Sequence, residues 1–368
     1  MKFLQTLLFM LSVVITGQAS AATTTLTDVL GNKITLNTPV KRAVLGFYFE
    51  DYMAVGGEQA FDHIVGISRE AWHGKVPANW DMYIKHRPSI ADIPDIGEID
   101  LHNVSLEKVI SLKPDVVILA SWQYAALKYE VTQLQSLNIP VVVLDYNDQT
   151  VENHVKSTEI IGILTGQTER AHELAQLYKN NITLIEDRIK QANLPKPKVY
   201  IEFGNKGPAE YSFTYGENMW GVMLRLAGSE NIAAPFVKQW GEINPEQLLV
   251  AKPDVIFISG RENNKVDTAL EMGIGVNEAT ARKKLNGFAH RDGWSSLPAI
   301  QNDRLFGVYQ GASRTLVDFT MVQFIAKSLY PDLFKDIDPV KNYHDYYTKY
   351  LPVVPVGTFA LSASAEQQ

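Results

Sequence analysis

Two glutamates occupy equivalent positions in the two halves of the chain. Glu107 and Glu246 each lie six residues before a Lys-Pro-Asp turn that leads directly into an apolar run. Ser105 and Asn244 are predicted helix N-caps, so both carboxylates fall in a first helical turn. The helix dipole favours a carboxylate there and could alone explain either one. Their recurrence so far apart predicts two similar lobes, each presenting one carboxylate that can form charge-assisted hydrogen bonds.

A second group of candidate residues consists of aromatic and basic side chains in loops that follow predicted strands. Aromatic rings offer stacking and cation–π surfaces, and guanidinium groups bind carboxylates, catecholates or oxyanions in bidentate fashion. Loops at the carboxyl ends of parallel strands are where open α/β sheets bind ligands. Arg314 could instead lie in solvent at a helix start. The candidate ligand-binding residues are Tyr48, Arg69, Trp72, His73, Trp122, Tyr215, Trp240 and Arg314.

Metal and catalytic motifs are scarce in this sequence. No two of the eight histidines have the spacing of a zinc site, and there is no cysteine. His290 could complete an unsaturated metal complex, or it could be a loop histidine in water. No phosphate-binding loop, His-Glu-x-x-His or Gly-x-Ser-x-Gly motif occurs. An enzyme is therefore disfavoured, although a catalytic triad is a spatial arrangement that sequence alone does not exclude.

The elements that must position these residues alternate between buried strands and helices. Short, β-branched apolar runs predict parallel strands covered on both faces. Residues 168–192 carry apolar side chains at spacings of three and four, which predicts one long amphipathic helix. We therefore expect an α/β fold of two Rossmann-like lobes with mainly parallel central sheets, joined by one long backbone α-helix. The predicted N-terminal lobe, helix linker and C-terminal lobe span 22–166, 167–194 and 195–361.

The two ends of the chain and its composition indicate an exported protein. Residues 1–21 have the charged start, short apolar core and small-residue site of a signal peptide. Residues 362–368 are polar and predicted to be a disordered tail. The net charge of −7 and the absence of a basic run argue against nucleic acid as a partner. Because the chain has no cysteine to carry a lipid, we expect it free in the periplasm rather than anchored.

The sequence as a whole resembles a known family. The hairpin at 27–32, the Ile-Val-Gly-Ile segment at 64–67, both Lys-Pro-Asp phrases, the backbone helix and the tract at 219–233 carry the resemblance, which covers essentially the whole mature chain. The family comprises the periplasmic substrate-binding proteins of ABC importers for iron siderophores, haem and vitamin B12, the helical-backbone class III proteins. These markers are specific to the family in combination, and they do not identify the ligand.

The resemblance implies a function and a delivery route. It implies a ligand held between the lobes, without a cofactor, in a monomeric receptor. We expect a ferric siderophore, with molybdate or tungstate, haem, a corrinoid or a nickel chelate as alternatives. Arg314 matches the arginine of binders of anionic siderophores, and Trp240 matches a cleft aromatic of B12 binders. Glu107 and Glu246 match the glutamates that bind arginines of the permease dimer in the inner membrane.

Overall fold

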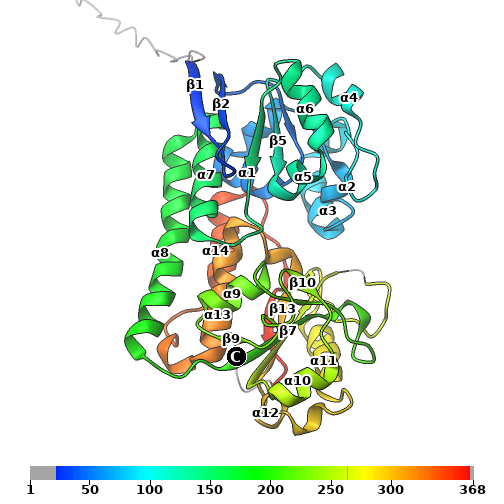
Figure 1. The fold of residues 1–368 in the computed structure, drawn as a ribbon, viewed down its shortest axis with the longest axis vertical. Helices are drawn as coiled ribbons and strands as arrows, with labels where there is room; N and C mark the ends of the chain where they lie inside the picture. Colours follow the sequence, from blue (N-terminus) through cyan, green and yellow to red (C-terminus); the bar gives the residue numbers. More distant parts are fainter. Residues whose placement is uncertain (1–21, 263, 365–368) are drawn as a thin grey trace, which may run out of the picture.

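The chain forms two α/β lobes stacked along the long axis of the molecule (Figure 1). The structure is a computed structural model that describes residues 22–262 and 264–364. The signal peptide predicted at 1–21 lies outside the described residues. Each lobe has a central sheet with parallel strands and helices around it. This arrangement confirms the predicted fold class.

The N-terminal lobe is built on a four-stranded parallel sheet in the order β4-β3-β5-β6. Its strands are nearly all apolar and almost entirely buried, as expected when helices cover both faces. An antiparallel hairpin of β1 (Ala22–Thr27) and β2 (Lys33–Thr38) precedes the sheet. The sheet strands are β3 (Ala43–Leu45), β4 (Ile64–Ile67), β5 (Val116–Ala120) and β6 (Val141–Leu144). The helices are α1 (Phe49–Gly56), α2 (Arg69–Trp72), α3 (Pro77–His86), α4 (Leu106–Ser111), α5 (Ser121–Ala126), α6 (Lys128–Ser136) and α7 (Val151–Thr165).

The C-terminal lobe has a five-stranded sheet in the order β15-β13-β11-β7-β9, in which only β15 runs antiparallel to its neighbour. Its strands are β7 (Lys198–Phe203), β9 (Glu230–Asn231), β11 (Val255–Gly260), β13 (Leu305–Tyr309) and β15 (Ala360–Ser362). Two small antiparallel pairs join β8 (Thr214–Tyr215) to β10 (Trp240–Gly241) and β12 (Gly273–Ile274) to β14 (Gly357–Thr358). The helices are α9 (Trp220–Leu226), α10 (Pro245–Ala251), α11 (Glu278–Ala289), α12 (Pro298–Gln301), α13 (Phe319–Leu329) and α14 (Pro339–Tyr350).

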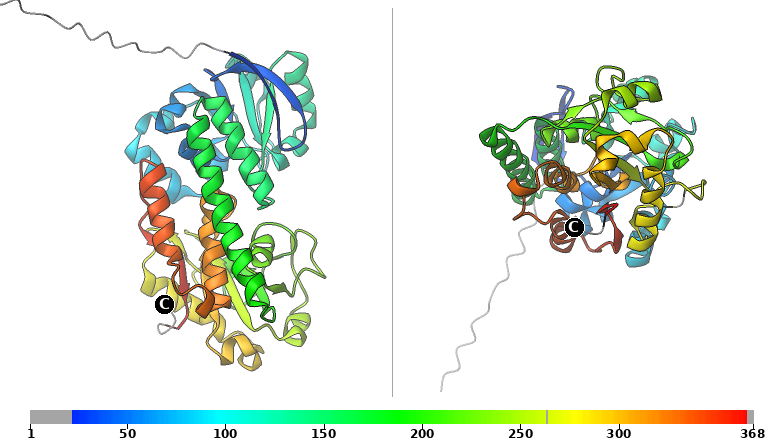
Figure 2. Two further views of the ribbon diagram at one scale, coloured as in Figure 1. Left: turned by 90° about the vertical axis from the view of Figure 1, so that its left-hand side faces the viewer. Right: turned by 90° about the horizontal axis from the view of Figure 1, so that it is seen from below.

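One long helix, α8 (Thr168–Ala192), spans both lobes (Figure 1). Its 25 residues give a rod of about 38 Å. The predicted apolar stripe is buried, from Ala171 through Tyr178 to Ile185, and α7 packs alongside it (Figure 2). The buried side chains of both lobes and of α8 form one continuous apolar cluster. Within the described ranges, no helix is both long and apolar enough to cross a membrane.

The C-terminal segment makes a second connection between the lobes. Helix α14 leaves the C-terminal lobe and reaches the N-terminal one, where Arg170 of α8 donates to the backbone oxygen of Tyr350. The chain then returns to the C-terminal sheet through β14 and β15. Ser362 is buried and pairs with Phe306 of β13. The predicted disordered tail 362–368 is therefore wrong for 362 and 363, because Ser362 ends β15 and the N–H of Ala363 donates to the backbone oxygen of Leu305 (2.9 Å). Residues 365–368 lie outside the described residues.

The repeated Lys-Pro-Asp phrase has the same local structure in both lobes. Lys113 and Lys252 end α4 and α10 with left-handed backbones, at φ 47° and 50°. The Asp115 carboxylate then accepts from the backbone N–H of Arg42 (2.9 Å), just before β3. Asp254 accepts from the N–H of Lys198 at the start of β7 (2.8 Å). The phrase thus stops a helix and aligns the next strand with its neighbour, which is a structural reason for its recurrence.

Candidate functional site

A cavity of about 580 Å³, including its open mouth, lies at the junction of the two lobes. The N-terminal lobe contributes the start of α1 and the region of α2 and α3, and the C-terminal lobe contributes the loop after β13 and one residue of α14. The lining residues are Phe47, Tyr48, Phe49, Glu50, Asp51, Ala71, Trp72, Lys75, Val76, Asn79, Tyr309, Gly311, Ser313, Arg314, Thr315 and Tyr347.

Arg314 brings an uncompensated positive charge to this cavity. No described carboxylate forms a salt bridge with its guanidinium, and its Nε has no hydrogen-bond partner among the described residues. The guanidinium carbon lies 5.8 Å from the ring centroid of Phe47. Burial lowers the pKa of Arg314, and the nearby phenols of Tyr215 and Tyr48 oppose that shift. Arg314 also has φ 66°, a left-handed backbone that is uncommon outside glycine.

Tyr48 and Trp72 form rigid parts of the cavity wall in the N-terminal lobe. The Tyr48 hydroxyl donates to Oδ1 of Asn147 (2.8 Å) and accepts from the N–H of Tyr146 (3.2 Å). Trp72 stacks on Phe49 with ring centroids 4.7 Å apart, and its indole N–H donates to Asn79. Because their polar atoms already have partners, these residues offer a ligand mainly ring surface.

Glu50 provides a carboxyl group on the same cavity. Its oxygens accept from the phenols of Tyr83 (2.9 Å) and Tyr347 (3.4 Å). Burial raises the pKa of Glu50, while hydrogen bonds from Asn79 and the two phenols oppose the rise. Glu50 lies in the first turn of α1, two residues after the predicted ligand residue Tyr48, whereas Tyr347 comes from α14 near the end of the chain. The regular tyrosines of α14 were the only signal for it in the sequence.

Trp122 and Tyr215 do not line the cavity but lie directly behind the lining residues. Trp122 contacts Phe47 edge-on, with centroids 5.6 Å apart, and the ammonium of Lys75 lies 4.6 Å from the Trp122 ring. That ammonium also binds Asp100 (2.8 Å), so its charge is compensated. The Tyr215 hydroxyl donates to Gln310 (3.3 Å), and burial raises its pKa to about 12.

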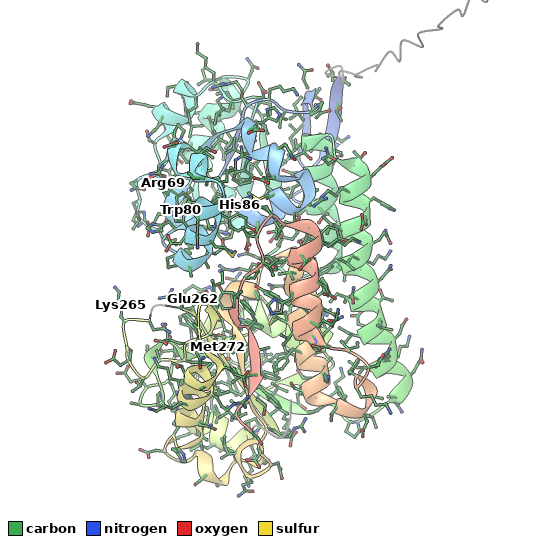
Figure 3. The ribbon with its side chains drawn as sticks, turned by 180° about the vertical axis from the view of Figure 1, so that it is seen from behind. Arg69, Trp80, His86, Glu262, Lys265 and Met272 are labelled. Carbon is green, nitrogen blue, oxygen red and sulfur yellow. The ribbon has the colours of Figure 1, made fainter. Side chains whose placement is uncertain are left out.

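The remaining predicted ligand contacts lie away from the lining of this cavity. Trp240 is 60% exposed on β10, with its ring 5.4 Å from Phe213. Arg69 donates to the backbone oxygens of Ala91 (3.0 Å) and Ile93 (2.8 Å), and lies in the N-terminal lobe beside Trp80 (Figure 3). Two exposed histidines, His73 and His290, are also not among the lining residues.

The described part of the chain contains no cluster of three or more histidine, cysteine, aspartate or glutamate side chains suited to a metal ion. His290 lies at the C-terminal end of α11, and its surroundings supply no such cluster. The buried Glu202 carboxylate, which belongs to the C-terminal core, is instead engaged by the guanidinium of Arg291.

Glu107 and Glu246 are both exposed in the first turns of α4 and α10. The predicted caps form: Ser105 Oγ accepts from the N–H of Lys108 (3.2 Å), and Asn244 Oδ1 accepts from the N–H of Glu246 (2.9 Å). Neither carboxylate makes a salt bridge within the described residues. The backbone cap is therefore provided by Ser105 and Asn244, and both glutamate side chains remain open to solvent.

Comparison with known proteins identifies the class that this fold and site define. The periplasmic binding protein family model matches residues 54–310, so the chain belongs to that family. Its members deliver small ligands to ABC permeases, and the related proteins are substrate-binding proteins rather than enzymes.

Three individual proteins are similar over most of the chain. The crystal structure of the TroA-like periplasmic binding protein FepB from Veillonella parvula superposes with a TM-score of 0.87 at 31% identity, covering 92% of this chain and 99% of that one. The molybdate-binding protein MolA of Haemophilus influenzae is 24% identical, over 88% of this chain and 90% of that protein. An ABC transporter substrate-binding lipoprotein of Bacillus subtilis, YvrC, is 28% identical over 70% of this chain and 73% of its own length.

Proposed function

We propose that this protein is a periplasmic receptor that binds an anionic iron chelate, a ferric siderophore, between its lobes and delivers it to an ABC permease. The observation that carries the proposal is the guanidinium of Arg314, which lines the cavity without a described carboxylate partner. Arg314 is half-buried. A cation that has lost part of its contact with water is costly unless it is paired, so an anionic ligand would supply the missing partner.

The cavity wall favours a chelate over a bare ion. Aromatic rings of Phe47, Phe49, Trp72 and Tyr309 line the cavity, which suits a ligand with extended apolar or aromatic surface. The charge-bearing oxygens of the chelate would face Arg314, where guanidinium donors match carboxylate or catecholate geometry. Because no described metal-binding cluster is present, the chelator would retain its metal.

A molybdate or tungstate oxyanion is the second candidate. The relative MolA is named as a molybdate-binding protein and aligns with most of this chain. Thr315 follows Arg314 in the cavity lining, and its hydroxyl, which makes only a long contact with the backbone oxygen of Ala312 (3.5 Å), could donate to an oxyanion. The two candidates differ in the size of the ligand, because the oxyanion would occupy only the end of the cavity near Arg314.

Delivery would use the two exposed glutamates. Glu107 and Glu246 lie on different lobes, and α8 and the continuous core hold those lobes together. Two carboxylates at a fixed spacing would engage basic residues of the permease only in the correct orientation. Export through the predicted signal peptide and a location free in the periplasm complete the proposal.

The decisive test is a tryptophan-fluorescence and calorimetric titration with ferric tris-catecholate, ferric citrate, molybdate, haemin, cobalamin and a neutral ferric trihydroxamate. We expect the anionic ferric chelates to bind, and Arg314→Gln to weaken them by about 30-fold or more, because a buried charged partner is lost. The affinity of Arg314→Lys should be intermediate, because lysine keeps the positive charge but lacks the paired N–H donors of the guanidinium.

The control variant is Arg188→Gln, which removes a guanidinium that forms an exposed pair with Asp336. It should leave every affinity unchanged. Binding of molybdate alone would select the second candidate. Binding of the neutral trihydroxamate alone, with equal affinity in Arg314→Gln, would refute an anionic cargo altogether.

A further inference from the structure

Residues 314–318 of the C-terminal lobe are attached to the N-terminal lobe at two buried points. The N–H of Leu316 donates to Oδ1 of Asp51 on α1 (2.7 Å). Two residues further, Oδ2 of Asp318 lies 3.1 Å from Nε2 of His154 on α7. The side chains of Asp51, His154 and Asp318 are all buried. The segment that begins with the cavity residue Arg314 is therefore held from the opposite lobe.

The hydrogen bonds of His154 determine where its protons lie. Nδ1 is 3.1 Å from the backbone oxygen of Thr150, and a carbonyl oxygen only accepts, so Nδ1 carries a hydrogen. A contact of Nε2 with Asp318 then requires one more proton between them, on either the ring or the carboxyl group. Without it, a nitrogen lone pair would face a carboxylate oxygen at hydrogen-bond distance in a dry interior.

We propose that His154 and Asp318 share one proton across the lobe junction, and that this proton holds the 314–318 segment so that Arg314 faces the cavity. His154 is then a positioning residue for ligand binding rather than a ligand contact. The positioning half of this inference rests on the proposed function, whereas the shared proton does not.

The pair is enclosed by aromatic rings and buried carboxyl groups. Tyr178 of α8 stacks on His154 (centroids 4.2 Å apart), and Tyr146 meets it edge-on (5.0 Å). Burial and then Asp318 raise the pKa of Tyr178, so this phenol stays neutral. Two further carboxyl groups lie near the pair, Asp51 on α1 and Asp148 in the loop before α7, and burial raises the pKa of both.

The backbone of Arg314 explains why its segment needs such attachment. Its left-handed conformation, at φ 66°, is disfavoured for a residue with a side chain and persists only where the surroundings hold it. Within the C-terminal lobe, the preceding turn is held by Ser313, which donates to the backbone oxygen of Gln310 (2.8 Å). The two attachments at Leu316 and Asp318 hold the other side.

The test uses Asp318→Asn and Asp318→Leu, which have similar side-chain sizes. The Asn amide can donate to Nε2 of a neutral His154 and replaces the shared proton by a permanent one, whereas Leu cannot. Hydrogen exchange of the Leu316 amide, corrected for its intrinsic rate, would be measured at neutral pH in the ligand-free protein. Phenylglyoxal modification of Arg314 would report on the exposure of the guanidinium.

Asp318→Asn should keep the Leu316 protection of the wild type. Asp318→Leu should lose about tenfold or more of that protection, and its Arg314 should react several-fold faster. Asp336→Asn, at an exposed aspartate, should behave as the wild type.

The shared proton would be overturned if Asp318→Asn behaved like Asp318→Leu. Nitrogen NMR of His154 tests the same point without any variant: an unprotonated Nε2 beside an ionised Asp318 would also overturn it. Unchanged reactivity of Arg314 in Asp318→Leu would overturn the positioning role alone. None of these measurements uses a cargo, so failure of the proposed ligand class would not alter them.

Discussion

Replacement of Arg291 by methionine should strongly destabilise the C-terminal lobe. The guanidinium makes two hydrogen bonds to the Glu202 carboxylate (2.7 and 2.9 Å), and both side chains are buried. It also donates to backbone oxygens of the loop after β7, among them those of Pro208 (2.9 Å) and Glu210 (3.0 Å). Arg291→Met would leave Glu202 with only Tyr200 and a backbone N–H as partners.

The expected loss of unfolding free energy is about 3–5 kcal/mol, the usual result of removing one partner of a buried ion pair. For a lobe of this size, that corresponds to a decrease in Tm of roughly 6–20 °C. Glu202→Gln/Arg291→Met should recover most of the loss, because no charge then remains buried. Thermal and urea unfolding followed by circular dichroism would measure all three proteins.

The pH dependence of Arg291→Met has a definite sign. Burial already raises the pKa of Glu202, and Arg291 is the main group that opposes the rise. Without Arg291 the pKa rises further, so folded Glu202 binds a proton at a pH where the unfolded chain has released it. Stability of the single variant should therefore increase as the pH falls from about 7 toward about 5, and the double variant should lack this component.

The reasoning would be refuted if Arg291→Met melted within about 1 °C of the wild type, or if the double variant were no more stable than the single one. Arg188→Met provides the matched control, because its pair with Asp336 is exposed. The consequence for binding is local: the loop that Arg291 holds leads to Phe213, and Phe213 lies 6.0 Å from Tyr215, behind the cavity.

Two further predictions concern the surface. The double variant Glu107→Ala/Glu246→Ala should bind ligand with unchanged affinity. It should reduce transport in reconstituted vesicles by about tenfold or more, because two charge-assisted contacts with the permease are lost. Equal loss of affinity and transport would contradict a docking role. The hydrogen bond from Arg188 lowers the pKa of Asp336 to about 2, so this pair contributes stability that is present above about pH 4 and lost as the pH falls toward 2. Arg188→Gln should therefore be slightly less stable than the wild type above about pH 4, and the difference should disappear as the pH falls toward 2. A difference of the same size at both ends of this interval would count against this explanation.

Much of the fold follows from local patterns. The stripe at 168–192 predicts α8 because an amphipathic helix of that length must bury one face. The two Lys-Pro-Asp phrases predict equivalent helix ends and strand starts, and the hydrogen bonds of Asp115 and Asp254 show why the same residues recur. The polar composition of the last seven residues led to the wrong prediction that a disordered tail begins at 362. Ser362 is held by the backbone of a neighbouring strand rather than by its own side chain.

The candidate site could be predicted only in part. Loop position after a strand led to Tyr48, Trp72 and Arg314, which all line the cavity. The same criterion led to Arg69, whose guanidinium instead binds backbone oxygens within its own lobe. It could not lead to Tyr347, because a helix near the end of the chain reaches the cavity only through its path between the lobes.

By itself the sequence determined the class of protein, the two lobes, the helix between them and the exposed glutamate of each lobe. These features depend on periodicity, caps and turns, which act over a few residues. Only the tertiary structure decided that Arg314 lines the cavity without a carboxylate partner and that Asp318 meets His154 across the junction. Such relations join residues far apart in the chain, and they arise only when both lobes pack against the same helix.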